Sequence, residues 1–416
     1  MKILQINTIA GSGSTGRIVI DILKTIQSHG DEGVIACAID ETNEHDKPYI
    51  YKVGGQRNPR LAHALAARFT DRSGFYSKRA TNELVEYIDK NHFDIIHLHN
   101  IHGYYINLPI LFNYIRDKKI KVVWTLHDCW AFTGHCTHFD FSGCQKWKTQ
   151  CQECPQRGRY PRSILLDSSK RNFIEKKLLY GNGLDLTIVT PSQWLADLCK
   201  QSFLGNYDVK VIRNGIDLEK FYPRDPTEFK RNIGLVNKKI VLAVCAGWSM
   251  RDIKNNRKGM ADILKLSEML PEEYQIVMVG FPNEEDKKGL PAKILGVTKT
   301  KSIDELAQWY SAADVFINPT YEDNFPTTNL EALACGTPVI TYETGGSPEA
   351  VRDKTGIIVE KGDLEGLIKA IYSMIPKEEY TNNCVRMSEK YDRKITFEEV
   401  YRLYESCRSV DDETCH

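Results

Sequence analysis

Two acidic residues in the last third of the chain have the spacing of a ligand-binding helix entry. Seven residues separate Asp323 from Glu331, and the pattern of residues 327–335 predicts a helix that begins between them. Asp323 would then lie in the preceding loop, and Glu331 about one turn inside the helix. Ionised carboxylates in such places can accept strong hydrogen bonds from a ligand. The alternative is a capped helix whose glutamate is solvated.

A glycine-rich loop near the start of the chain has the composition of a phosphate-binding turn. Gly11–Gly16 matches G-x-G-x-x-G between a strand pattern and a helix pattern, and Asp40 ends the next strand pattern. That combination is typical of dinucleotide binding, but two residues separate the first strand from the loop and no hydride-transfer site follows. A turn without a ligand is the other alternative. The small residues, Gly13 and Gly16 among them, would let the backbone approach a diphosphate at a helix N-terminus.

Histidine side chains follow two of the predicted strands. His99 comes after the strand at 94–98, and His127 with Asp128 comes after the strand at 121–126. Sites in α/β folds lie beyond the carboxyl ends of parallel strands, where these residues stand. Since imidazole titrates near neutral pH, we expect protonation of His127 to matter.

Strand patterns alternate with helix patterns through both halves of the chain, and this arrangement must position those side chains. The predicted strands are 2–8, 33–39, 94–98, 121–126, 186–190 and 209–212 in the first half, and 240–246, 274–279, 315–318 and 338–342 in the second. The alternation predicts an α/β protein with two parallel sheets. Residues 41–75 are polar and have no clear pattern, whereas 395–407 are amphipathic.

Composition limits the class of protein. A chain of 416 residues is long enough for two domains. It contains 55 basic and 55 acidic residues, a balance that argues against a dedicated nucleic-acid binder. Its first residues do not resemble an export signal, and no stretch has the roughly 20 apolar residues of a membrane span. We therefore expect a cytoplasmic protein with reduced cysteines.

The helix-entry segment and several shorter motifs together resemble a known family. Residues 331–338 read EALACGTP, which follows E-x7-E in the retaining glycosyltransferases of family 4, proteins of the GT-B fold. Shorter matches follow in family order: HD at 127–128, TPS at 190–192, NGID at 214–217, KG at 258–259 and GGSPE at 345–349. The resemblance covers nearly the whole chain.

This resemblance implies an architecture. We expect two Rossmann-like domains that face each other across a cleft. Residues 1–220 would bind the acceptor and residues 221–390 the nucleotide-sugar donor. A C-terminal helix within 391–416 would cross back to the first domain.

The resemblance also implies roles for the residues around the two acids. Glu331 would hold the ribose hydroxyls of the nucleotide. Asp323 would hold the transferred sugar together with nearby backbone amides, those of Asn324 and Phe325. Glu322 would replace Asp323 if the loop is reshaped.

Cationic residues would bind the donor diphosphate. Lys258 matches the lysine that does so in the family, and the alternative is an ordinary exposed lysine at a helix start. The family commonly has an arginine after the glycine that ends the first strand of the second domain, whereas Trp248 follows Gly247 here. Arg251 or Arg257 would supply the missing charge.

In the implied reaction, His127 orients the sugar and the Gly13–Gly16 loop touches the phosphates. Cationic side chains and a helix N-terminus would stabilise the leaving group, so that no cofactor or metal is required for catalysis. A hexosyl unit would pass with retention to a glycan or lipid-linked acceptor for a cell-surface polysaccharide. Two alternatives stay open: a nucleotide-sugar isomerase on the same fold, and a non-catalytic nucleotide-sugar binder.

Four cysteines are gathered in the polar loop after the His127 strand. They are Cys136, Cys144, Cys151 and Cys154, and the last pair forms C-x-x-C-P. Three interpretations remain open: a structural zinc site, reduced packing thiols, and disulfides.

The next segment, 156–177, is rich in basic residues. Its cations are Arg157, Arg159, Arg162, Lys170, Arg171, Lys176 and Lys177, against Asp167 and Glu175. One interpretation is a solvated helix face. The other is contact with anionic lipid head groups or a lipid-linked phosphate, which would make the protein peripheral on the cytoplasmic face of the membrane.

Overall fold

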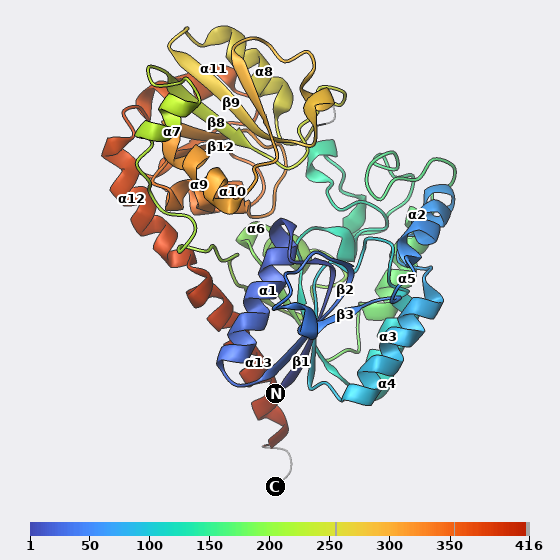
Figure 1. Cartoon of the computed structure of the whole chain (residues 1–416). Coiled ribbons are helices and arrows are strands. Elements are labelled where there is room, and N and C mark those ends of the chain that lie inside the picture. The colour runs from blue at the N-terminus through green and yellow to red at the C-terminus, as the bar shows by residue number, and fades with distance from the viewer. Residues whose placement is uncertain (254–255, 353, 413–416) are drawn as a thin grey trace. The chain divides into compact units, whose positions relative to one another are not determined.

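The computed structural model describes residues 1–253, 256–352 and 354–412. By their internal contacts these residues divide into two compact units. The first unit contains 1–213 and the chain from Thr396 on, and the second contains 214–395. Each unit has its own parallel sheet, which confirms the predicted α/β class with two Rossmann-like domains (Figure 1).

The first unit is built on a seven-stranded sheet with the order β3-β2-β1-β4-β5-β6-β7. All its neighbouring strands are parallel. The strands are β1 (Lys2–Ala10), β2 (Glu32–Asp40), β3 (Ile50–Lys52), β4 (Ile95–Leu98), β5 (Lys121–Thr125), β6 (Leu186–Thr190) and β7 (Asp208–Val211). The helices are α1 (Gly13–Ser28), α2 (Pro59–Thr70), α3 (Lys78–Asn91), α4 (Leu108–Lys118), α5 (Ser169–Tyr180) and α6 (Gln193–Lys200).

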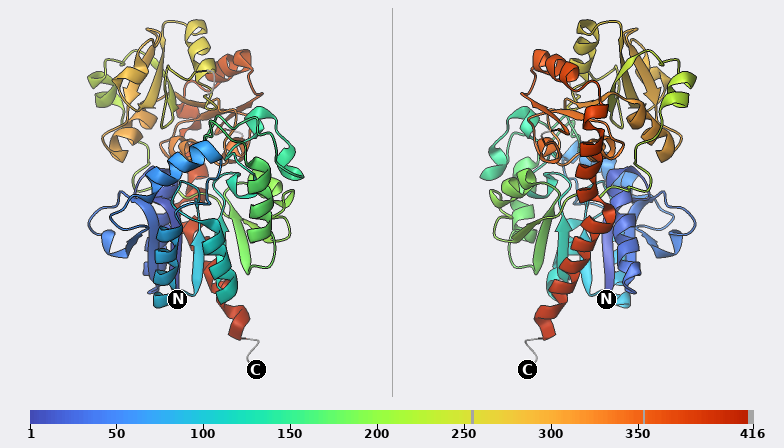
Figure 2. Two further views of the ribbon diagram at one scale, coloured as in Figure 1. Left: turned by 90° about the vertical axis from the view of Figure 1, so that its right-hand side faces the viewer. Right: turned by 90° about the vertical axis from the view of Figure 1, so that its left-hand side faces the viewer.

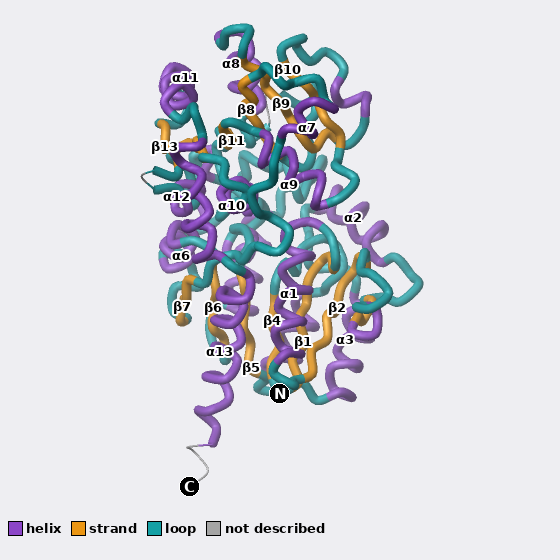
Figure 3. Tube along the Cα trace, turned by 60° about the vertical axis from the view of Figure 1, so that its left-hand side comes forward, coloured by secondary structure: helices purple, strands orange, loops and turns teal. Residues whose placement is uncertain are grey.

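Both faces of this sheet are covered, and its central strands are therefore largely apolar, although β1 also buries Gln5 and Asn7 and β4 buries His97. Leu4 of β1 belongs to a core that includes residues of α3 and α4, whereas Ile3 belongs to another core on α1. Helix α13 (Arg393–Asp412) completes that second core through Phe397 and Tyr404. Figures 2 and 3 show α13 running along the first sheet.

The second unit has a six-stranded parallel sheet with the order β10-β9-β8-β11-β12-β13. Its strands are β8 (Lys239–Val244), β9 (Tyr274–Phe281), β10 (Ile294–Thr298), β11 (Val315–Asn318), β12 (Val339–Tyr342) and β13 (Gly356–Val359). Its helices are α7 (Thr227–Asn232), α8 (Met260–Met269), α9 (Ile303–Ala312), α10 (Thr327–Ala334), α11 (Leu364–Ser373) and α12 (Glu378–Ser388).

Candidate functional site

The centre of the second unit's site is an ion pair between Lys258 and Asp323, whose Nζ and Oδ2 atoms are in contact. Gly259 makes this approach possible. Its φ is +79°, and a β-carbon there would lie 2.0 Å from the Pro319 carbonyl oxygen. Only glycine fits at this contact, which sets Lys258 beside the loop that carries Asp323.

Backbone contacts of Arg257 hold the same two segments together. Its Nη1 donates to the Glu322 carbonyl at 2.6 Å, and its own carbonyl accepts from the Tyr321 amide at 2.7 Å. Glu322 is fully buried. Of the two arginines expected to replace the missing charge, Arg257 adjoins Lys258 in this arrangement. Arg251 instead lies 3.9–4.0 Å from acids in the turn at Glu284–Lys287.

The loop around Asp323 is fixed from both sides. The Asp323 carbonyl accepts a 3.0 Å bond from the Gly346 amide, and a β-carbon on Gly345 would lie 2.0 Å from that carbonyl. The Asn324 amide, expected at the sugar, donates to Asp323 Oδ1 at 2.9 Å. Phe325 is buried in the unit's core.

Glu331 lies inside α10, as the sequence predicts, and is only 3% exposed. Its Oε2 accepts a 2.9 Å hydrogen bond from the Tyr310 hydroxyl, a partner that sequence reasoning missed. Tyr310 is ten or more residues from any motif and is buried in the core, so its apolar pattern gave no functional signal. Trp248, which stands where the family has arginine, is also buried.

In the first unit, the glycine loop follows directly from the strand. Strand β1 extends to Ala10, so the turn begins directly after it, at Gly11. The expectation that two residues separate the strand from the loop, which counted against dinucleotide binding, is therefore wrong. Gly11 has a φ of +92° and lies against the Glu41 carbonyl, which would be 2.4 Å from a β-carbon. Helix α1 begins at Gly13, so Gly13 and Gly16 both lie in its first turn.

Asp40, the acid of the dinucleotide interpretation, makes hydrogen bonds within its own turn. Its Oδ1 already accepts hydrogen bonds from the Thr42 amide at 3.0 Å and the Thr42 hydroxyl at 2.5 Å. These local bonds close the turn after β2.

Three histidines meet at the carboxyl ends of β4 and β5. Nδ1 of His99 lies 3.1 Å from Nε2 of His127, and the ring of His97 is 4.0 Å from that of His99. Burial lowers the pKa of His127 to about 4 and that of His97 to about 3. The expectation that His127 titrates near neutral pH is therefore wrong, because desolvation disfavours the imidazolium.

A second group at this edge joins Asp128 to an aromatic loop. His102 Nε2 lies 2.8 Å from Asp128 Oδ2, and its Nδ1 lies 3.0 Å from the Tyr160 hydroxyl. Burial opposes ionisation of Asp128, but His102 outweighs it and the carboxyl pKa falls to about 2. Sequence reasoning missed His102, which stands alone in an unpatterned loop, and Tyr160.

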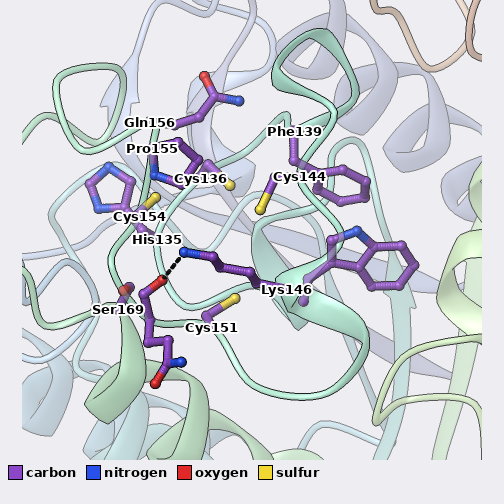
Figure 4. A pocket seen from close by; sticks show the side chains of 12 residues that line it. His135, Cys136, Phe139, Cys144, Lys146, Cys151, Cys154, Pro155, Gln156 and Ser169 are labelled. Carbon is purple, nitrogen blue, oxygen red and sulfur yellow. Dashed lines mark hydrogen bonds between the residues drawn. The ribbon is translucent and has the colours of Figure 1, made fainter.

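The four predicted cysteines line one small pocket together with His135 (Figure 4). Each is a free thiol, which contradicts the disulfide interpretation. Within 1–253, 256–352 and 354–412, no three His, Cys, Asp or Glu side chains are already arranged to hold a metal ion. The structure thus brings the thiols together as packed, reduced side chains, and zinc binding stays a prediction.

The basic segment is only partly a solvated face. Lys176, within α5, is 1% exposed, and its Nζ donates to the Trp130 carbonyl at 2.7 Å and the Thr133 carbonyl at 3.1 Å. Burial lowers its pKa to about 7. Lys176 therefore braces the loop after β5 and does not contribute to the predicted basic surface. No helix in the described ranges is long and apolar enough to cross a membrane.

Comparisons with known proteins match both units. The sequence model described as Glycosyltransferase Family 4 matches residues 15–220, and that described as Glycosyl transferases group 1 matches 242–376. A putative colanic acid biosynthesis glycosyl transferase, WcaC of Escherichia coli K12, is 24% identical over 439 aligned positions, which cover 98% of this chain and 100% of that protein.

Two solved structures resemble the fold over the same extent. Sucrose-phosphate synthase from Thermosynechococcus elongatus has a TM-score of 0.71 at 16% identity, covering 98% of this chain and 99% of that one. The Anabaena protein Alr3699/HepE in complex with UDP-glucose has a TM-score of 0.68 at 16% identity, covering 98% and 100%.

Proposed function

The chain belongs to the family 4 (group 1) glycosyltransferases of the GT-B fold, and from that premise we propose its reaction. It transfers a hexosyl unit, with retention, from a nucleotide-diphosphate sugar to a glycan or lipid-linked acceptor. The product belongs to a cell-surface polysaccharide. The WcaC relative, which bears a colanic acid biosynthesis name, supports the polysaccharide, and the UDP-glucose complex of HepE supports the donor class.

The observation that carries the donor assignment is the Lys258–Asp323 pair, beside Arg257 and before α10. Burial raises the pKa of the Cys245 thiol, which follows β8, and the charges of Lys258, Arg257 and Asp323 also act on it. Two cations there can neutralise a diphosphate, and Asp323 can accept hydrogen bonds from sugar hydroxyls. Glu331 would accept from ribose. We assign 221–390 as the donor domain on these grounds.

The departing nucleotide gains negative charge in the transition state. Lys258 and Arg257 would stabilise that charge, and the N-terminus of α10 adds its dipole. Catalysis would then require no bound metal.

We assign 1–220 to the acceptor. His127 would act at the sugar as a neutral imidazole, a role that its depressed pKa favours. The loop with Gly13 and Gly16 supplies small residues and a helix N-terminus for phosphate contact. We propose that the enzyme works in the cytoplasm at the membrane surface, where a lipid-linked acceptor would be presented.

A thermal-shift screen of nucleotide sugars tests the proposal, followed by transfer assays with the best donor and NMR of the product's anomeric carbon. We expect a donor-dependent shift and a product with the donor's anomeric configuration. Inversion would overturn the retaining mechanism. An epimerised donor without acceptor would select the isomerase, and Asp323→Asn protein should lose the corresponding activity in either case.

A further inference from the structure

An exposed apolar surface on the first unit remains unused by the proposed chemistry. On α2, Leu61, Leu65 and Phe69 are 76%, 59% and 44% exposed. They follow at four-residue intervals and so share one side of the helix. His63 and Ala67 on the opposite side are buried, so α2 is anchored by its inner face. Among the residues that the structure describes, this outer row belongs to none of the hydrophobic cores, so core packing does not explain its apolar character.

A second segment extends this surface. Ile164, Leu165 and Leu166 are 48%, 63% and 51% exposed. The Ile164 amide donates to the Arg68 carbonyl at 2.8 Å, and the Leu166 amide donates to the Phe69 carbonyl at 3.0 Å. These bonds fix the loop at the C-terminal end of α2. We call the six side chains, Leu61, Leu65, Phe69, Ile164, Leu165 and Leu166, the apolar platform.

The two segments that carry the platform have charge of one sign. Residues 56–70 and 155–166 contain six arginines and no acid. The arginines are Arg57, Arg60, Arg68, Arg157, Arg159 and Arg162. Asp167, next along the chain, accepts hydrogen bonds from the Cys154 and Ser169 amides at 2.6 and 2.9 Å, which partly satisfy its charge. Asp71 is buried against His135.

We propose that the apolar platform and its arginines bind the surface of an anionic lipid bilayer. Exposed leucine and phenylalanine side chains beside arginines are suited to the boundary between acyl chains and head groups, since apolar groups enter the chains and cations meet lipid phosphates. A soluble acidic protein would satisfy the arginines but would not explain six exposed apolar side chains. The inference rests on the proposed membrane-side acceptor and gives that contact a defined surface.

Vesicle co-sedimentation with the full chain tests this without any sugar. Vesicles of phosphatidylcholine containing phosphatidylglycerol should bind the protein, and phosphatidylcholine alone should bind it about tenfold less. The Leu61→Ser/Leu65→Ser variant should lose about tenfold or more of the binding. Arg68→Glu/Arg162→Glu should lose a comparable amount, and high salt should weaken the wild type.

The matched control is Val236→Ser, which removes an exposed apolar side chain from the second unit and should bind as wild type does. Circular dichroism and the thermal shift given by UDP should be the same for all variants, which separates this test from the proposed catalytic role. Equal binding to both kinds of vesicle, or normal binding of the leucine variant, would overturn the proposal. The proposal would also be overturned if the protein bound no vesicle and formed a dimer that the leucine variant dissociates. The platform would then join two copies of the chain.

Discussion

Lys258 and Asp323 form an ion pair although 65 positions separate them in the chain. Their side chains are 24% and 15% exposed, so both remain within reach of a ligand. In the proposed mechanism, this pair sets the cation that binds the phosphate against the anion that binds the sugar. Each partner holds the other in place.

Replacement of Lys258 by alanine should impair the chemical step. The leaving diphosphate would lose one of its cations, and kcat should fall by about 10²–10³. Steady-state kinetics with saturating donor measures this. Lys265→Ala, on the exposed side of α8, is the control and should be normal. A Lys258→Ala enzyme with wild-type kcat would remove this lysine from the mechanism.

Glu331→Gln should weaken nucleotide binding by about 1–3 kcal/mol, because a charge-assisted bond to ribose is lost. Calorimetric titration gives this difference directly. Tyr310→Phe removes only the hydroxyl that contacts Glu331 and should have a smaller effect of about 1 kcal/mol. Unchanged affinity in the glutamine variant would reject the ribose assignment.

Chelation should leave the reaction intact. Lys258, Arg257 and the α10 terminus replace a divalent ion in the proposed mechanism, so transfer should survive EDTA. The assay compares rates before and after chelation, with melting curves to exclude unfolding. If magnesium or manganese alone restored a rate lost in correctly folded protein, the leaving group would need a metal.

Acid should destabilise the fold through His97, which is fully buried, and His127, which is half-buried. Burial lowers the pKa values of His127 to about 4 and His97 to about 3, below those of the unfolded chain. The unfolded state therefore binds protons first, and stability present above about pH 6.5 is lost as the pH falls towards 4. His127→Gln should make the pH dependence of the urea midpoint shallower.

The matched control for that experiment is His45→Gln, since the His45 side chain is 83% exposed. Its slope should follow the wild type. If the His127→Gln slope equals those of the wild type and of His45→Gln, His127 gains no protons on unfolding in this range.

The cysteine pocket predicts a link between metal content and acceptor chemistry. If the thiols hold zinc, the ion cross-links the loop after β5 and reduces the conformational freedom of that loop. Cys154→Ser should then lose bound zinc and acceptor-dependent rate together, while nucleotide affinity, assigned to the other unit, stays nearly unchanged. Elemental analysis of purified protein is the first measurement, and Cys199→Ser, a buried thiol elsewhere, is the control. Metal-free wild-type protein would leave the four cysteines as packing thiols.

Much of the fold could be predicted because parallel strands buried on both faces are continuous apolar runs. The run at Val315–Asn318 is of this kind up to its last residue, and that at Lys2–Ala10 is interrupted by buried Gln5 and Asn7. Strand β3 could not be found, since it has only three residues at a sheet edge, two of them half-buried and Lys52 exposed. Helix α2 was missed because its outer face is apolar, which obscures the usual amphipathic pattern.

The residues of the candidate site also fall into those that the sequence reveals and those that it does not. Asp323 and Glu331 are close in sequence, so a local motif reveals them. Tyr310 and His102 reach their partners only through tertiary packing, across 21 and 26 positions. Nor could the sequence show that His127 packs against the buried ring of His99, in surroundings that keep it neutral.

The packing of α13 has a consequence for engineering. Tyr404 is fully buried in the first unit, 2.5 Å from His97 Nδ1, although the whole second unit precedes it in the chain. A chimaera that exchanges the second unit between relatives therefore needs two junctions, one near 213/214 and one near 395/396. A single crossover would give the first unit a foreign tail, and His97 would lose its tyrosine unless that tail evolved for the same core.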